Sequence, residues 1–437
     1  MKEAGFRRRG RATRFPFRYG IAAMTRLPHV FLEVRMEVDG RECRGLSSEG
    51  LPPKWFTKDP GTTFEEDLPA MLRVLEHAVE MARGITADSV FGFWHRLYTG
   101  QGEWGRGGGL PPLLVHLGTS LVERAVIDAA CRAMEMPFAL ALRGGHLGVD
   151  LGVVHPELRG SRPSEWLPER AVGTIVARHT VGLGDPLGPD DITDDDRAGD
   201  DLPQALSDAI DRYGLTHFKV KICGDLATDV PRLVAIANLL AGKVPGYRFT
   251  LDGNEQYRRL SDFRAHWEAF LAEPELADFL SSEHLLFVEQ PLHRDEALHP
   301  GLGDELAAWK LAPPMIIDES DAELDSLRQA LALGYRGTSH KNCKGVFKGV
   351  ANRCLLGWYR RHCPDEGPWL MSGEDLANVG PVALLNDLAV MSTLGIKDVE
   401  RNGHHYFAGL SMYPSTLQEQ VCEAHPDLYA RREGGFA

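Results

Sequence analysis

One pattern constrains this chain more than any other: between residues 217 and 341, five short apolar segments each end in ionisable residues. The segments read HFKVKI, FTLDGNEQ, LFVEQP, MIIDES and TSHKN. Their apolar parts are short and rich in Val, Ile, Leu and Phe, which is typical of buried parallel strands. A strand needed only for a core has no reason to end in a charge. The five together therefore indicate one site at one end of a sheet.

The spacing of these charges predicts the fold. They recur at intervals of 23 to 37 residues, and a (β/α)8 barrel of about 250 residues spends roughly 31 on each strand–helix unit. Helical patterns at 225–240, 260–271 and 322–333 fill the intervals. Such barrels keep their active sites at the C-terminal ends of the strands. We therefore expect an α/β protein built on a TIM-type barrel, with the charged residues around its mouth.

The residues before the barrel predict a separate capping domain. Apolar and polar residues alternate over 30–38, and Asp39-Gly40 then favours a hairpin turn. We expect an α+β capping domain at 24–118 and the barrel at 119–407, with the glycine-rich stretch 102–110 as a linker. The C-terminal tail, 408–437, is expected to pack on the cap.

Two charged segments are predicted to lie outside the site and the domain cores. The first twenty residues carry seven Lys or Arg against one Glu, with no apolar stretch typical of a secretory signal. We predict a disordered basic tail at 1–23, the alternatives being an extension before a start at Met24 and a targeting or partner-binding arm. The acidic stretch 185–201 is expected to be a solvated surface loop with no ligand role.

Composition excludes some classes of function. The chain has 437 residues and a net charge of −14, which argues against nucleic acid as the main partner. Its seven cysteines, an odd number without paired spacing, indicate reduced thiols in a cytoplasmic protein. No apolar run approaches the length of a membrane span, so we expect no membrane partner.

Three of the strand-end residues are carboxylates on successive predicted strands: Asp252, Glu289 and Asp318. Hard oxygen ligands around one point suit Mg²⁺, with Mn²⁺ as a possible substitute. No His or Cys lies among the three, which disfavours zinc. The alternative is a set of structural ion pairs, but those need no recurrence once per strand–helix unit.

The lysines supply candidate acid/base groups. Period-2 geometry places Lys219 and Lys221 on one face of their strand, and Lys341 ends a later strand. Like charges and a divalent cation lower the pKa of a lysine, and a metal stabilises a developing oxyanion. Together these groups could remove a proton α to a carboxylate and hold the resulting enediolate. If the register is off by three residues, Lys344 is the base instead; otherwise Lys344 and Lys348 are expected to be solvent-facing or helix-start charges.

The ordered motifs KVK, LDGN, FVEQP, IDES and a strand-end lysine resemble the enolase superfamily, and within it the mandelate racemase/muconate lactonizing enzyme family. The resemblance spans most of residues 28–407. It implies metal ligands at Asp252, Glu289 and Asp318. It also implies that Lys221 and Lys341 are opposed acid/base residues, and that Lys219 polarises the substrate carboxylate.

The resemblance adds residues around this centre. Asn254 and Glu319 are implied to support the ligands and lysines, and the 47–58 loop is implied to close over the substrate. The candidate substrate-binding residues are Trp55, Phe56, Glu374 and His404. The C-terminal end of the eighth strand, ERNGHH, lacks the D-x-D of dipeptide epimerases.

The sequence therefore predicts a Mg²⁺-dependent isomerase that acts through an enediolate, either a racemase or epimerase or a cycloisomerase. An acid-sugar dehydratase or another syn-eliminating lyase is the alternative. The second alternative is a metal-binding barrel that has no catalytic activity. The expected partner is a small-molecule carboxylate, and we expect a homo-oligomer.

Overall fold

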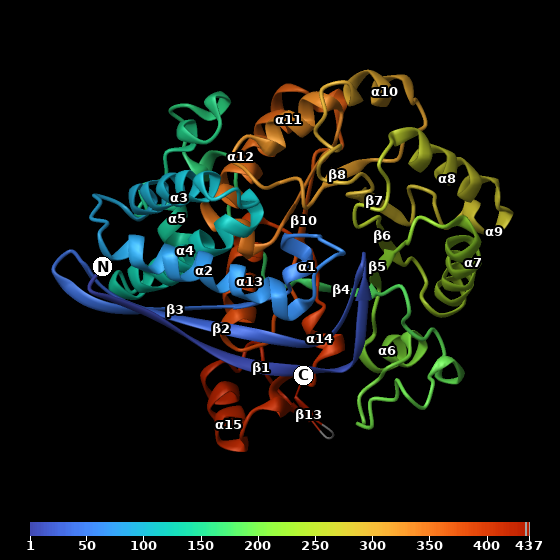
Figure 1. Ribbon diagram of the computed structural model, residues 1–437, viewed down its shortest axis with the longest axis horizontal. Coiled ribbons are helices and arrows are strands. Elements are labelled where there is room, and N and C mark those ends of the chain that lie inside the picture. The colour runs from blue at the N-terminus through green and yellow to red at the C-terminus, as the bar shows by residue number, and fades with distance from the viewer. Residues whose placement is uncertain (433–434, 437) are drawn as a thin grey trace.

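The computed structural model describes residues 1–432 and 435–436. Its centre is a closed, eight-stranded parallel barrel in the order β10-β11-β4-β5-β6-β7-β8-β9, so the predicted fold class is confirmed (Figure 1). The barrel strands are β4 (Val176–Val181), β5 (His217–Lys221), β6 (Arg248–Asp252), β7 (Leu285–Glu289), β8 (Met315–Ile317), β9 (Gly337–His340), β10 (Leu370–Glu374) and β11 (Asp398–Glu400).

Helices surround the barrel on its outside. Along β5, Phe218 and Val220 face outward and pack against these helices in a common apolar core, while Lys219 and Lys221 alternate with them and face inward. The longer barrel helices are α6 (Leu206–Tyr213), α7 (Leu226–Lys243), α8 (Leu260–Ala272), α10 (Leu302–Ala308), α11 (Ser326–Leu333), α12 (Val346–His362) and α13 (Val382–Leu394). Short helices are α9 (Pro274–Ala277) and α14 (Gly403–Tyr406). No helix among the described residues is long and apolar enough to cross a membrane.

A three-stranded antiparallel sheet, in the order β1-β2-β3, forms the floor of the cap. Val30, Leu32 and Val34 are fully buried on one face, and Asp39-Gly40 makes the predicted turn with positive φ at both residues. The elements that precede the barrel strands are β1 (Glu3–Tyr19), β2 (Ala22–Val38), β3 (Arg41–Gly50), α1 (Pro53–Phe56), α2 (Phe64–Arg83), α3 (Val90–Gly107), α4 (Pro112–Ala133) and α5 (Phe138–Arg143).

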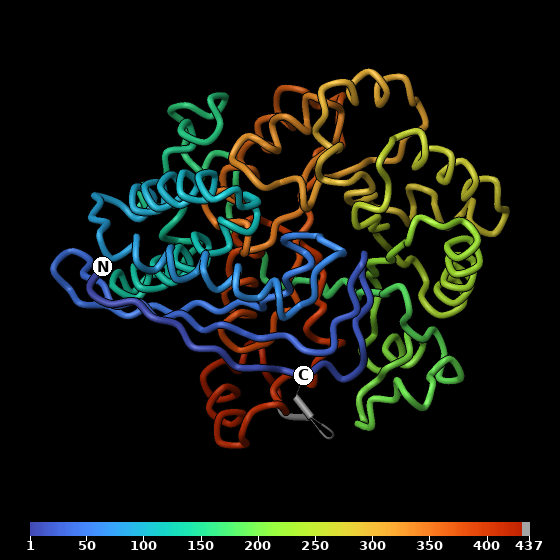
Figure 2. Tube along the Cα trace, in the orientation of Figure 1, coloured from blue at the N-terminus to red at the C-terminus, as the bar shows by residue number. Residues whose placement is uncertain are grey.

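The prediction of a disordered tail at 1–23 is wrong. Residues 3–19 form β1, which pairs with β2 along nearly its whole length. Figure 2 shows this hairpin running across the molecule in dark blue, with its tip turned toward the barrel. The basic composition of this segment was misleading as a sign of disorder, because two of its arginines are paired with carboxylates of another segment. Arg14 binds Asp200 in a bidentate ion pair with bonds of 2.7 Å, and Arg18 lies 3.4 Å from Asp196.

The acidic loop 185–201 is mostly exposed, as predicted, but two of its carboxylates, Asp196 and Asp200, bind arginines of β1. Asp185 is buried and accepts a hydrogen bond of 2.6 Å from Tyr406. The stretch 102–110 is not a linker either, since α3 continues to Gly107. A side chain on Gly105 would meet Val115 at 2.3 Å, so the glycine allows α3 and α4 to pack closely.

The chain after the barrel returns to the cap sheet. Arg11 of β1 donates to the carbonyl of Met412 at 3.3 Å, and its guanidinium lies 4.4 Å from the centre of the Tyr413 ring. Helix α15 (Ser415–Ala424) follows, and then the short strands β12 (Arg431–Arg432) and β13 (Gly435–Phe436).

Candidate active site

The strand-end charges meet at the mouth of the barrel, as expected from their spacing. Lys219 and Lys221 come from β5, and Lys341 directly follows β9. All three are buried and line one cavity. In the ring of eight strands, β5 and β9 are four positions apart. Lys221 and Lys341 therefore approach the cavity from opposite sides.

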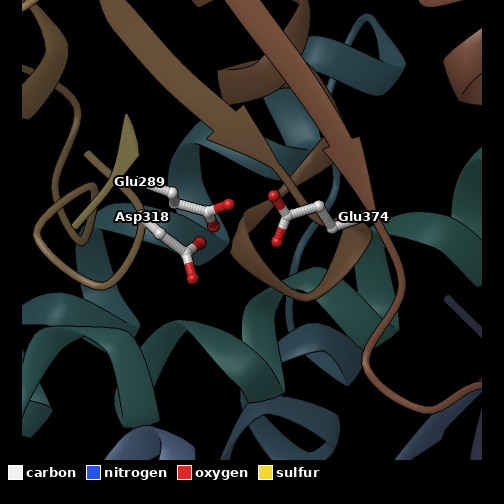
Figure 3. Close-up of side chains that lie close together, drawn as sticks. All are labelled: Glu289, Asp318 and Glu374. Atoms are coloured by element: carbon white, nitrogen blue, oxygen red, sulfur yellow. The ribbon is translucent and has the colours of Figure 1, made fainter. Parts of the chain in front are cut away.

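A carboxylate cluster lies below this cavity. Glu289 (β7), Asp318 (after β8) and Glu374 (β10) each offer an oxygen within 4.8 Å of the others. Figure 3 shows the three carboxylates pointing toward one another. The cluster contains two of the three predicted ligands, Glu289 and Asp318, together with Glu374, and the third predicted ligand, Asp252, lies 3.0 Å from the Lys219 ammonium that also contacts Glu289 and Glu374.

The cluster fits a hard divalent cation. Every donor is a carboxylate oxygen, and all three side chains are buried. Neither oxygen of Glu289 accepts a hydrogen bond from any described residue, although the Lys219 ammonium lies 2.8 Å from one of them. Burial, and next the charge of Glu374, raise the pKa of Glu289 well above its usual value. Buried carboxylates held so close together favour a cation between them.

Lys219 lies at the centre of the acidic residues. Its ammonium is 3.0 Å from Asp252, 2.8 Å from Glu289, 2.9 Å from Glu374 and 3.1 Å from Glu400. Burial acts to lower its pKa, but the four carboxylates outweigh burial and raise the pKa well above that of a free lysine. Lys219 is therefore a fixed positive charge in this structure.

The two flanking lysines have different partners. Lys221 donates 2.8 Å hydrogen bonds to Asp252 and to the side-chain oxygen of Asn254. Lys341 lies 2.7 Å from Asp318 and 2.5 Å from Glu374. Burial opposes the charged form of Lys341, yet these two carboxylates raise its pKa. The ammoniums of Lys219 and Lys341, against the effect of burial, lower the pKa of Glu374.

Lys344 and Lys348 lie at the turn before α12 and in its first turn, as one of the two expectations had it, but neither faces solvent. Both are buried. Lys344 lies 3.1 Å from Asp318 on the side away from the cavity, and Lys348 lies 3.0 Å from Asp321. The short turn at 342–344 and the start of α12 carry them behind β8, where the buried aspartates provide partners. Lys341, and not Lys344, lines the cavity.

The cap closes the cavity from above. Its lining includes Phe17 and Tyr19 of β1, Met24 of β2, and Trp55 of α1. The Trp55 ring lies over Lys341, with its centre 5.1 Å from the ammonium. The enclosed space is only about 40 Å³, far below the several hundred Å³ of typical ligand sites (about 300–1,000 Å³). The structure is therefore closed over the site.

Other predicted residues lie around or outside this cavity. Asn254 lines it, whereas Glu319 lies beside Tyr19 and Lys58 in a neighbouring hollow. Burial, and next the charge of Asp318, raise the pKa of Glu319 to about 8. Phe56 is fully buried in the cap core, and His404 instead contacts His179, with ring nitrogens 3.0 Å apart.

The sequence analysis missed several residues of the site. Glu400 ends β11 and binds Lys219. It could have been predicted from the sequence KDVE, because it is a charged residue at the end of a strand, like the residues predicted on the other strands. Phe17 and Tyr19 were missed because the segment was judged by its arginines. The alternation in FPFRY (15–19) was the available signal.

Comparison with known proteins supports the fold. No protein-family description matches the chain, and no curated protein does. Among solved structures, a mandelate racemase/muconate lactonizing protein from Herpetosiphon aurantiacus is 18% identical, with 93% of this chain and 90% of that chain covered and a TM-score of 0.61. The L-Ala-D/L-Glu epimerase from Bacillus subtilis is 15% identical, with 100% and 96% covered and a TM-score of 0.58.

A third similar structure contains a metal and a ligand. The dipeptide epimerase from Enterococcus faecalis V583, complexed with Mg and the dipeptide L-Leu-L-Tyr, is 14% identical, with 93% and 91% covered and a TM-score of 0.59. At these identities the likeness establishes a shared fold of barrel and cap, as the resemblance of the sequence implied.

Proposed function

We propose that this protein is a divalent-metal-dependent racemase or epimerase of the enolase superfamily, which removes and returns the proton α to a carboxylate. One observation carries the proposal. Lys221 and Lys341 face one closed cavity from opposite sides, directly above a cluster of buried carboxylates. Two opposed acid/base groups are what inversion of a carbon centre needs.

Glu289, Asp318 and Glu374 are the residues that would hold the metal, and Asp252 lies beside them as the remaining predicted ligand. The chemistry that a divalent cation supplies there is neutralisation of these carboxylates and stabilisation of an enediolate oxyanion. Carboxylates bound to a cation would hold Lys341 in its charged form less strongly, and its pKa would then fall toward that of a base.

The site contains buried charges of both signs. The carboxylates include Asp252, Glu289, Asp318, Glu374 and Glu400, and the ammoniums include those of Lys219, Lys221, Lys341 and Lys344. A divalent cation held by the carboxylates would add positive charge to the site, which favours an anionic substrate such as a carboxylate.

In the proposed reaction, the substrate carboxylate lies against Lys219 with its α-carbon between Lys221 and Lys341. One lysine, in its neutral form, takes the α-proton. The other lysine, in its charged form, delivers a proton to the opposite face. The closed cap excludes water, which strengthens the electrostatic stabilisation of the enediolate. We also propose that the protein is cytoplasmic and forms a homo-oligomer.

Exchange of the α-proton in D₂O, followed by NMR with Mg²⁺, tests the proposal whatever the product. The panel should contain dipeptides, N-succinyl amino acids and 2-hydroxy acids such as mandelate, because proteins of similar structure include a dipeptide epimerase, an N-succinyl Arg/Lys racemase from Bacillus cereus and an enolase from Bradyrhizobium complexed with magnesium and mandelic acid. We expect exchange with at least one class of carboxylate, abolished by EDTA and restored by Mg²⁺.

Single variants then separate the reactions. In a racemase, Lys221→Ala should stop exchange from one enantiomer, and Lys341→Ala should stop it from the other. Each loss should be at least about 10²–10⁴-fold, the usual contribution of a general base. If both variants fail on one and the same enantiomer, the enzyme is a lyase or cycloisomerase. Full exchange in chelated protein, or in the double variant, contradicts the proposal.

A further inference from the structure

A group of ion pairs joins the cap loop to the barrel beside Lys221. Lys58, at the end of this loop, lies 3.0 Å from Glu255, which follows β6. The Lys58 ammonium also contacts the backbone carbonyl of Asn254. Arg294 binds both carboxylate oxygens of Glu255, at 2.7 and 2.8 Å. Glu255 thus receives a cap cation and a barrel cation at once.

Arg294 also reaches back to the cap. It donates hydrogen bonds of 2.9 Å to the carbonyls of Trp55 and Phe56. The Glu255 side chain is fully buried, and that of Lys58 is 10% exposed. Paired charges excluded from water, with several hydrogen bonds, hold a fixed geometry far better than exposed pairs. We name Lys58, Glu255 and Arg294 the cap latch.

The backbone at the cap latch is strained. Lys58, Asn254, Glu255 and Gln290 all have positive φ, of 51°, 39°, 66° and 37°. None of them is a glycine, and such conformations persist only where the surroundings enforce them. The amide of Glu255 donates to the carbonyl of Gln290 at 2.8 Å, which connects the loop after β6, with Asn254 and Glu255, to the loop after β7, with Gln290.

The loop after β6 contacts Lys221 through the side chain of Asn254. With Asn254 in its left-handed conformation, its side-chain oxygen accepts the 2.8 Å hydrogen bond from Lys221, while its amide donates to Asp252 at 2.9 Å. Relaxation of Asn254 to an ordinary conformation would carry this side chain away. The contact of Lys58 with the Asn254 carbonyl therefore connects the cap loop, through a single residue, to Lys221.

We propose that the cap latch couples closure of the cap loop to the position of Lys221, with Lys58 and Glu255 acting as positioning residues through Asn254. Phe17, Tyr19 and Trp55 of the cap line the cavity, which is only about 40 Å³ in this structure, so in this proposal the cap loop opens to admit a substrate. When it opens, Lys58 leaves Glu255 and Asn254, and Lys221 loses one of its two fixed partners, Asn254, while Asp252 remains. The site is thereby assembled only when closed. The part of this inference that concerns Lys221 rests on the proposed function.

The chain offers a matched control for the test. Lys54 lies in the same loop and is also ion-paired, but all its partners are in the cap: Asp67 at 2.7 Å, and the Asp59 carbonyl and Thr62 hydroxyl at 2.6 Å. Lys58→Met removes a contact between the cap and the barrel, whereas Lys54→Met removes a contact within the cap. Lys58→Arg keeps the charge and should restore the contact.

Hydrogen exchange of the amides at 253–256, in the free protein, tests the latch without any assumption about function. We expect Lys58→Met to speed this exchange at least tenfold, and Lys54→Met and Lys58→Arg to leave it within about twofold of wild type. Equal effects of Lys58→Met and Lys54→Met, or no effect of Lys58→Met, would overturn the latch. Circular dichroism confirms that each variant is folded.

Kinetics test the connection to Lys221. In Lys58→Met, α-proton exchange from the enantiomer that Lys221 serves should fall at least tenfold more than exchange from the enantiomer that Lys341 serves. Equal losses from both enantiomers would refute the positioning of Lys221, because a merely structural role affects both alike. If wild-type protein shows no α-proton exchange, the proposed function fails, and hydrogen exchange still decides the latch.

Discussion

At the scale of single residues, three lysines within eight positions have three different surroundings. Lys341 lines the cavity, Lys344 supports Asp318 from behind, and Lys348 neutralises Asp321 in the protein interior. The sequence KNCKGVFKG does not distinguish them, because it does not show which buried carboxylate each ammonium will reach. The surroundings of each lysine therefore decide its role, and Lys348 gives the clearest prediction.

Lys348→Met should destabilise the fold without touching the site. Asp321 is buried, and its other partners are the neutral groups of Thr338 and Asn352 and the more distant Lys344, 3.8 Å away. Removing one member of a buried ion pair costs about 3–5 kcal/mol of unfolding free energy. Urea denaturation measures this loss, and the double variant with Asp321→Asn should recover part of it.

The control for this prediction is Lys243→Met, which removes an exposed ion pair with Asp211. Such pairs contribute only about 0–1 kcal/mol. If Lys348→Met costs no more than Lys243→Met, Asp321 does not depend on Lys348 for its charge balance.

The strand-end lysines and carboxylates were predictable from sequence because parallel strands of one barrel end at one edge. The spacing of Lys221, Asp252, Glu289 and Asp318 therefore placed them together. The place of Glu374 was not predictable in this way. Its carboxylate lies within 4.8 Å of those of Glu289 and Asp318 because side chains converge around Lys219, and a linear pattern of charges does not encode their directions.

At the scale of elements, α1 places two adjacent aromatic residues in different surroundings. Trp55 lies over Lys341 at the roof of the cavity, and Phe56 packs inside the cap. Trp55→Phe should alter KM or kcat by about tenfold or more, because a smaller ring weakens a contact with a desolvated ammonium that is worth up to about 2 kcal/mol. Steady-state kinetics and metal titration measure this, and metal affinity should not change.

Phe56→Leu is the matched comparison for Trp55→Phe. It replaces one buried apolar side chain with another and should cost less than about 1.5 kcal/mol of stability while leaving the kinetics unchanged. If Phe56→Leu shifted substrate preference and Trp55→Phe did not, the assignment of the two residues would be reversed.

The strand β1 shows where reasoning from composition fails. Seven basic residues in the first twenty indicated a solvated tail, yet Phe15 and Phe17 pack against Tyr406, with ring centres 5.3 and 4.0 Å away. Alternation along the strand places aromatic rings toward the barrel. Arginines such as Arg14 and Arg18 find their carboxylates in an acidic loop about 180 residues later. Pairing between segments so distant in the chain leaves no local signal.

At the scale of the whole molecule, buried titratable groups make stability depend on pH in two opposing ways. Burial lowers the pKa of several histidines, which favours the folded state as pH rises through the mildly acidic range. Burial raises the pKa of Glu49, Glu123 and Asp375 to about 7, which has the opposite effect over the same range. The histidines concerned are His29, His116, His155, His179, His340, His404 and His405.

His29 isolates one side of this balance. It lies on β2 against the chain that follows the barrel, with its ring centre 5.7 Å from that of Phe407, and burial lowers its pKa to about 4. In the unfolded chain His29 takes up a proton near the ordinary histidine pKa of 6.5. Its contribution to stability is therefore complete above that pH and is lost as pH falls toward 4.

The expected loss from His29 between pH 7 and pH 4 is roughly 3 kcal/mol, since one pKa unit corresponds to about 1.4 kcal/mol. His29→Gln keeps a polar side chain but cannot titrate, so the difference in unfolding free energy between wild type and variant should shrink by that amount as pH falls. Urea denaturation at pH 7, 6, 5 and 4 measures the difference. A difference that stays constant over this range would mean that His29 can be protonated in the folded protein, and that the junction between cap and barrel is open to water.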